Sequence, residues 1–166
     1  MSRLEATDSL VIRLSNLLLS QMATVVTAES CTGGLLASEL TAQSGCSAWF
    51  EGGWVCYSNE QKQAMLGVSM DEIERHGAVS IPVVEALVAG ALARSTATWA
   101  VAVSGVAGPL GGTVAKPVGM ICLAWQQRNR ACMSETIYLS GTRREIQEQV
   151  VVYGLVRLIR EIEQAV

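Results

Sequence analysis

Helical and strand-like patterns alternate along this chain, and a helical pattern stands at each end of it. Helices that alternate with buried strands must cover both faces of the sheet that those strands form. The order of patterns therefore predicts an α/β fold, a three-layer α/β/α sandwich. The 166 residues suit one compact domain, and no repeat, linker or low-complexity stretch divides residues 1–166.

The spacing of apolar residues places the expected elements. We expect helices at 10–19, 32–42, 59–66, 69–76, 80–94 and from 142 onward. We expect strands at 23–27, 52–57, 99–104, 118–125 and 133–139. Ser69 and Glu72 have the spacing of a capping box, and Ser80 with Pro82 is typical of a helix start.

Charge and hydropathy exclude several classes of partner. The net charge is −3, and the 12 Lys and Arg residues are scattered apart from Arg143 and Arg144. A nucleic-acid-binding protein would carry a basic face, so we expect no nucleic-acid partner. The amino-terminal apolar residues are interrupted by polar ones, and no window is long enough to cross a bilayer. We therefore expect a soluble, cytoplasmic protein with no membrane partner.

The cysteines bear on disulfide and metal chemistry, and the tryptophans bear on the oligomeric state. The five cysteines form no C-x-x-C pair and the chain has one histidine, which argues against a disulfide framework and a structural zinc site. Reduced thiols in the core are the simplest interpretation of Cys31, Cys46, Cys56, Cys122 and Cys132. Large apolar side chains favour burial, so the four tryptophans favour a homo-oligomer, although one monomer could also bury them. They are Trp49, Trp54, Trp99 and Trp125.

The segment VVTAESCTGGLLASEL, residues 25–40, is a strand followed by a polar turn, two glycines and a helix. Unpaired N–H groups at such a turn can hold an anion. A hydroxyl facing them could attack a carbonyl, and the same amides could hold the oxyanion. Two interpretations stay open: Ser30 is a nucleophile, or Ser30 or Thr32 only caps the helix.

A nucleophilic serine needs a base. His76 stands at the end of a short helix, so a Ser-His-Asp triad is not favoured. Lys62 lies shortly after the strand in YSNEQK, and a desolvated lysine there could act as the base. An exposed, solvated lysine is the alternative.

The segment SGVAGPLGGTVAKPVG, residues 104–119, is a glycine-rich loop between two apolar strands. Its amides could line an anion or nucleotide pocket with Lys116 as the counter-charge. The spacing matches neither the Walker nor the Rossmann pattern, so a plain flexible loop is the alternative.

Four segments, TAESCTGG, YSNEQK, HGAVS and SGVAGPLGGTVAKPVG, together resemble the signature blocks of the CinA C-terminal domain family. The blocks come in family order and cover roughly the whole chain. The resemblance implies an α/β/α domain that hydrolyses the carboxamide of nicotinamide mononucleotide to the acid and ammonia, without a metal or cofactor. It implies a serine nucleophile at Ser30, assisted by Tyr57 and Lys62.

On this resemblance, turn amides at Thr32, Gly33 and Gly34 would hold the oxyanion. Hydrogen-bond donors and positive charge would hold the phosphate of the nucleotide. Glu29 would either contact the substrate or hold the turn in place. The residues expected to bind the substrate are Glu29, Asn59, Ser104, Gly105, Gly111, Gly112, Thr113, Lys116 and Arg143.

The chain departs from the family pattern at Leu110, Val114 and Ala115 in the loop and at Thr142 before the last helix. None of these departures is a proposed catalytic residue, but they lie next to residues that are expected to bind the substrate. Two alternatives to the amidohydrolase therefore stay open. One is a catalytically silent, competence- or damage-linked protein that binds a nucleotide or partner, and the other is a hydrolase of another small amide.

Overall fold

The computed structural model describes residues 3–165. Its strands are β1 (Val25–Glu29), β2 (Phe50–Val55), β3 (Trp99–Gly105), β4 (Met120–Gln127) and β5 (Met133–Tyr138). Its helices are α1 (Arg3–Ser20), α2 (Leu35–Ala42), the 3-10 helix η1 (Cys46–Ala48), α3 (Asn59–Leu66), α4 (Met70–His76), α5 (Ile81–Ala93) and α6 (Arg143–Gln164).

The five strands form one mixed sheet in the order β2-β1-β3-β4-β5. Strand β1 pairs in parallel with both β2 and β3, whereas β4 and β5 continue the sheet antiparallel. Parallel strands end at the same edge of a sheet, and Glu29 is in register with Val55 and Val103. The residues that follow β1, β2 and β3 therefore meet at one edge.

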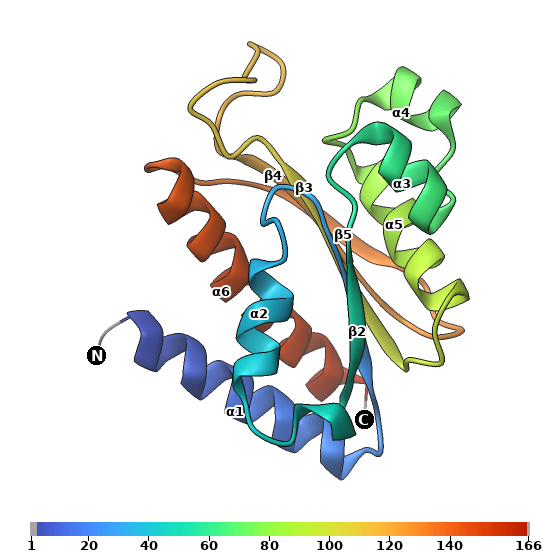
Figure 1. Cartoon of the computed structure of the whole chain (residues 1–166), viewed down its shortest axis with the longest axis vertical. Coiled ribbons are helices and arrows are strands. Elements are labelled where there is room, and N and C mark those ends of the chain that lie inside the picture. The colour runs from blue at the N-terminus through green and yellow to red at the C-terminus, as the bar shows by residue number, and fades with distance from the viewer. Residues whose placement is uncertain (1–2, 166) are drawn as a thin grey trace.

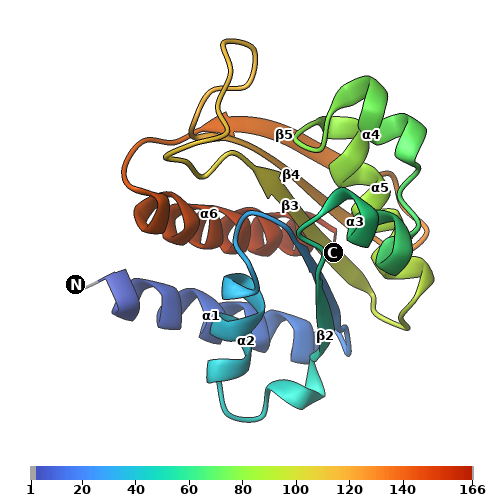
Figure 2. The ribbon, with the colours of Figure 1, turned by 45° about the horizontal axis from the view of Figure 1, so that its top comes forward.

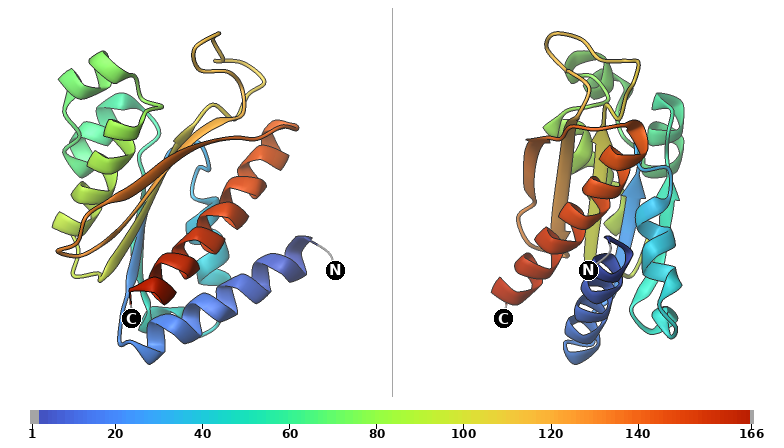
Figure 3. Two further views of the ribbon diagram at one scale, coloured as in Figure 1. Left: turned by 180° about the vertical axis from the view of Figure 1, so that it is seen from behind. Right: turned by 90° about the vertical axis from the view of Figure 1, so that its left-hand side faces the viewer.

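Helices cover both faces of the sheet, as Figures 1 and 2 show. Figure 3 shows α1, α2 and α6 on one face and α3, α4 and α5 on the other. Along β3 the side chains alternate: Trp99 and Val101 belong to the core under α6, and Ala100 and Ala102 to the core under α5. Small side chains on the second face let α5 lie close to the strands.

The α/β/α sandwich predicted from the sequence is confirmed, with shifts at element ends. Strand β1 begins two residues later than expected, and α2 begins at Leu35 because the turn uses residues 31–34. The capping box expected at Ser69 is absent, since the Ser69 side chain makes no capping hydrogen bond. The Ser80 hydroxyl does not cap α5 either; it donates to Gly77 O at 2.8 Å.

Three tryptophans, Trp49, Trp99 and Trp125, are at most 1% exposed within the chain itself. One monomer thus buries three of the four tryptophans and leaves Trp54 partly buried, and the homo-oligomer stays a prediction. Across residues 3–165, no helix has the length and apolar character needed to cross a membrane.

A close approach of α5 to α3 generates the first prediction. A Cβ placed on Gly90 of α5 would overlap the main-chain carbonyl of Leu66, the last residue of α3. We expect Gly90→Ala to lower the free energy of unfolding by about 1–3 kcal/mol because the two helices must separate. Urea denaturation followed by circular dichroism measures this change.

Gly154→Ala is the matched control. Gly154 is also buried in a helix, but the nearest atom to an added Cβ there is Leu123 Cδ2 at 3.7 Å, an ordinary contact. We expect no loss of stability from Gly154→Ala. Equal losses in the two variants would contradict the proposed close approach.

Candidate active site

Ser30 follows the last residue of β1 and opens the turn into α2. Its N–H donates to Val103 O at 3.0 Å, which extends the pairing with β3 by one residue, and Gly33 N donates to Ser30 O at 3.1 Å. The residue is 7% exposed. The end of the sheet and the turn together therefore hold the Ser30 main chain on both sides.

The carboxylate of Glu29 holds the rest of the turn. It accepts hydrogen bonds from the Thr32 hydroxyl at 2.6 Å and from the N–H groups of Gly34, Leu36 and Ala37 at 2.8–3.1 Å. It thus caps α2 from the preceding strand, and neither Ser30 nor Thr32 caps that helix. Glu29 has the structural role that the sequence left as an alternative, and its oxygens are occupied.

The same contacts change the assignment of oxyanion donors. The amides of Gly33 and Gly34, both predicted to hold an oxyanion, already donate to Ser30 O and to the Glu29 carboxylate. The amide of Thr32 donates to no acceptor within residues 3–165. Thr32 is therefore the predicted donor that keeps a free N–H.

Lys62 of α3 points its ammonium at Ser30. Nζ lies 3.1 Å from Ser30 Oγ and donates to Tyr57 O at 2.8 Å. The residue is 1% exposed, so the alternative of a solvated lysine is wrong. No carboxylate among the described residues forms an ion pair with it. Burial lowers the pKa of Lys62 from its ordinary value because the charged form loses its hydration.

Tyr57 reaches the site in two ways. Its carbonyl orients Lys62, whereas its side chain is 59% exposed and its hydroxyl lies 3.1 Å from Arg143 Nη2. Arg143 Nη1 donates to Gly108 O at 2.8 Å. Arg143 therefore joins the tyrosine at the mouth of the site to the base of the glycine-rich loop.

These side chains line a cavity of about 200 Å³. It is lined by Ser30, Cys31, Tyr57, Asn59, Lys62, Ala78, Val79, Ser104, Gly105, Ala107 and Arg143. Seven residues predicted from the sequence thus meet here. Sequence reasoning placed no site residue in the segment of Ala78 and Val79, although HGAVS was one of the blocks that carried the resemblance.

The wall formed by Ala78 and Val79 is held by two of the predicted binding residues. The Ser104 hydroxyl donates to Ala78 O at 2.8 Å, and Lys116 Nζ donates to Val79 O at 2.7 Å and to His76 O. Lys116 is not among the residues that line the cavity. Its ammonium is committed to these carbonyls, so the structure does not bring it into the site as a counter-charge.

The tip of the glycine-rich loop stands away from the cavity. Figure 1 shows the loop between β3 and β4 projecting beyond the sheet. Gly111, Gly112 and Thr113 border a separate hollow within the loop, so the structure does not bring these predicted binding residues to Ser30. The departures Leu110 and Val114 are at least 86% exposed.

Thr142, the fourth departure, has a structural explanation. Its side chain accepts from Glu145 N and the Glu145 carboxylate accepts from Thr142 N, which makes a capping box at the start of α6. The box fixes the first turn of α6, from which Arg143 extends into the site.

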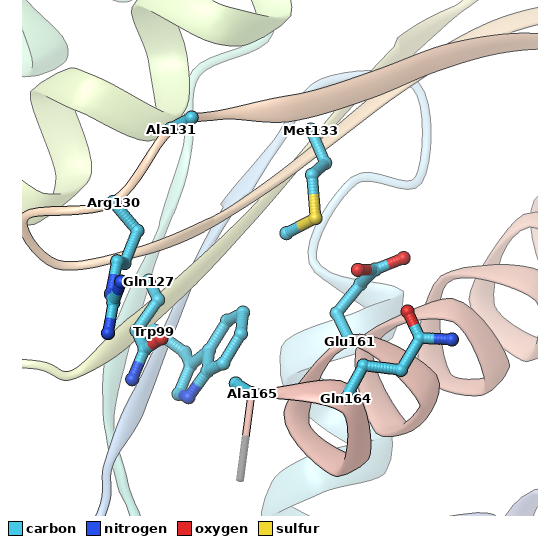
Figure 4. A pocket seen from close by; sticks show the side chains of 8 residues that line it. All are labelled: Trp99, Gln127, Arg130, Ala131, Met133, Glu161, Gln164 and Ala165. Atoms are coloured by element: carbon cyan, nitrogen blue, oxygen red, sulfur yellow. The ribbon is translucent and has the colours of Figure 1, made fainter.

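A second hollow lies at the opposite end of the sheet, between the start of β3 and the end of α6 (Figure 4). Trp99 and Glu161 on its wall are 1% and 9% exposed, so they offer little surface to a ligand. It contains no serine, threonine, cysteine or lysine. The hollow therefore lacks the nucleophile and base that the cavity at Ser30 contains.

Cys31 is the other candidate nucleophile in that cavity. Burial raises the pKa of its thiol to about 12, so the reactive thiolate is scarce at neutral pH. Ser30, with an amine beside its hydroxyl, is the better placed nucleophile. Among residues 3–165, no group of three or more His, Cys, Asp or Glu side chains could hold a metal ion.

Comparison with known proteins identifies the family and supports the fold. The family model "CinA C-terminal domain" matches residues 7–162. The chain is 49% identical over 152 residues to "Nicotinamide-nucleotide amidohydrolase PncC" of Pseudomonas putida, covering 92% of this chain and 94% of that protein. It is 43% identical over 162 residues to the protein of the same name in Escherichia coli K12, covering 95% and 98%.

Longer relatives and solved structures also match. A "CinA-like protein" of Mycolicibacterium gilvum is 50% identical over 126 residues, which are 76% of this chain and only 30% of that protein. The crystal structure of "competence/damage inducible protein CihA" from Agrobacterium tumefaciens superposes with a TM-score of 0.91 at 40% identity, covering 93% and 94% of the two chains.

The buried lysine generates a stability prediction. The lowered pKa of Lys62 means that the unfolded chain binds more protons, so wild-type stability rises with pH between the folded pKa and 10.5. Methionine carries no charge to bury. We expect Lys62→Met to unfold with a free energy no lower than the wild type at pH 7, an advantage that shrinks toward pH 10.5.

Urea denaturation at several pH values measures this difference. Gln63→Met, at the exposed neighbouring position, is the control and should differ from the wild type by the same amount at every pH. A Lys62→Met variant that is clearly less stable at pH 7 would show that the amine stabilises the fold instead.

Proposed function

The chain belongs to the CinA C-terminal domain family, and we propose that it hydrolyses the carboxamide of nicotinamide mononucleotide with Ser30 as the nucleophile. The products are nicotinate mononucleotide and ammonia. The observation that carries the assignment of the nucleophile is the buried Lys62 amine 3.1 Å from the Ser30 hydroxyl.

In the first half of the reaction, the neutral amine of Lys62 takes the proton of the Ser30 hydroxyl while Oγ attacks the carboxamide carbon. Lys62 donates one N–H to Tyr57 O, and this hydrogen bond leaves the lone pair of the neutral amine free to face Ser30. Desolvation raises the fraction of neutral amine, which is the form that a base needs.

The tetrahedral oxyanion then collapses and the bond to nitrogen breaks. The Lys62 ammonium returns its proton to the leaving nitrogen, so ammonia departs and a Ser30 ester of the acid remains. A water molecule attacks this ester as Lys62 takes its proton. The bond to Oγ then breaks, the Lys62 ammonium returns the proton to Oγ, and the acid leaves with the Ser30 hydroxyl and the neutral amine restored. The free N–H of Thr32 is our candidate donor to the oxyanion in both halves.

The nucleotide has a proposed orientation. A cavity of about 200 Å³ is smaller than the usual drug-sized pocket of roughly 300–1,000 Å³. We place the pyridine ring and carboxamide inside it and the ribose phosphate at its mouth. Arg143 at that mouth would bind the phosphate, with Asn59 beside it as a polar neighbour.

Ammonia release from nicotinamide mononucleotide tests the nucleophile. We expect Ser30→Ala to lower kcat/KM by on the order of 10⁴-fold or more, because the variant loses the hydroxyl that the Lys62 amine contacts. A coupled ammonia assay measures it. Ser95→Ala is the control: that hydroxyl donates to Ala91 O near the opposite end of the sheet, and its loss should leave the rate unchanged. Full activity in Ser30→Ala would refute the ester mechanism.

Arg143 gives a separate prediction about the phosphate. We expect Arg143→Gln to raise KM for nicotinamide mononucleotide by about 10- to 100-fold, because a charge-assisted hydrogen bond to the phosphate is lost. Hydrolysis of nicotinamide riboside, which has no phosphate, should change far less. Steady-state kinetics with both substrates measures the difference.

Arg144→Gln is the matched control, because Arg144 is the next residue and pairs with Glu148 at 2.8 Å instead of lining the cavity. Its KM should equal that of the wild type. Equal effects of Arg143→Gln on both substrates would place the phosphate elsewhere.

A further inference from the structure

One side chain of α6 reaches the turn that carries Ser30. Gln147 Nε2 donates to Cys31 O at 2.8 Å, across 116 residues of sequence. The other hydrogen bonds of this turn come from β3, from Glu29, from the start of α2, from the turn itself and from Lys62 of α3. Gln147 is therefore the link between α6 and the residue next to Ser30.

The bond fixes the orientation of one peptide group. A trans peptide is planar, so its C=O and the following N–H point in opposite directions. A donor that holds Cys31 O thus sets the direction of the Thr32 N–H. That N–H donates to no acceptor in the part of the chain that the structure describes, and Cys31, on the other side of the same peptide bond, lines the cavity.

Gln147 shares a helix face with Arg143. The two residues are four positions apart near the start of α6, and residues at this spacing lie above one another on a helix. Arg143 lines the cavity and Gln147 holds the turn beside it. One face of α6 therefore presents one side chain to the cavity and the other to the nucleophile turn.

We propose that Gln147 is a positioning residue for the hydrolysis: it holds the Cys31–Thr32 peptide so that the Thr32 N–H meets the oxyanion formed on attack by Ser30. The proposal rests on the proposed function. The bond to Cys31 O exists before substrate binds, so the donor is oriented in advance, which is the condition for strong stabilisation of a transition state.

Gln147→Met tests the proposal, since methionine keeps the length of the side chain and removes the donor. We expect kcat for ammonia release to fall by about 10²-fold, the cost of losing one oxyanion donor, while KM changes little. A merely structural bond would lower the melting temperature and leave kcat of the folded protein unchanged. Kinetics and thermal unfolding on the same samples separate the two.

Gln149→Met is the matched control. Gln149 lies two residues further along α6, and its amide donates to Ser140 O at 3.0 Å and Glu145 O at 3.1 Å, away from the turn. We expect its kcat to equal that of the wild type. An unchanged kcat in Gln147→Met, or equal losses in the two variants, would overturn the proposal.

A second assay separates this proposal from the proposed function. Phenylmethylsulfonyl fluoride sulfonylates an activated serine: Oγ bonds to sulfur, fluoride leaves and Lys62 takes the proton. If wild type releases no ammonia, the substrate is wrong. Sulfonylation of Ser30, followed by mass spectrometry, would still support the positioning role if Gln147→Met slows it at least tenfold relative to Gln149→Met. Equal rates, or a Ser30 that does not react even in wild type, would overturn it.

Discussion

The carboxylate of Glu29 is the contact on which the nucleophile turn depends. It is 1% exposed, yet it accepts four hydrogen bonds, three of them from N–H groups at the start of α2. A buried carboxylate is tolerated when its oxygens are satisfied, and the positive end of a helix stabilises it further. Because Ser30 is the next residue, the same carboxylate that starts α2 also limits where the hydroxyl can lie.

Lys62 differs from Glu29, because its ammonium makes hydrogen bonds to Ser30 and Tyr57 but has no ion-pair partner among residues 3–165. Burying an unpaired amine opposes folding, and the helix that carries it has only eight residues. The close contact of Gly90 with the end of that helix keeps α3 against α5. Tight packing on one side of α3 thus holds in place a side chain that stability alone would not favour.

The sequence predicted the order and type of the elements well, because each has its own periodicity. It also brought Ser30 and Lys62 together, since both follow parallel strands that end at one edge. It could not predict the roles of Ser104 and Lys116, because these depend on contacts 26 to 40 residues apart that leave no local pattern. The hydrogen bond from Gln147 to Cys31 O spans 116 residues and was not predicted for the same reason, although the spacing of Gln147 from Arg143 was a usable signal.

The departures from the family pattern lie at two places in the fold, the exposed part of the glycine-rich loop and the start of α6. The loop meets the site through its stem: Gly108 accepts from Arg143, and Lys116 holds the wall at Val79. Leu110 and Val114 lie at the exposed tip between these two anchors. A change at the tip therefore affects Ser30 only if it moves the stem. The acceptors in both anchors are main-chain carbonyls, Gly108 O and Val79 O, which a side-chain substitution at the tip does not remove. Leu110 and Val114 thus bear on what the tip contacts, whereas Thr142 bears on the first turn of α6 and on Arg143.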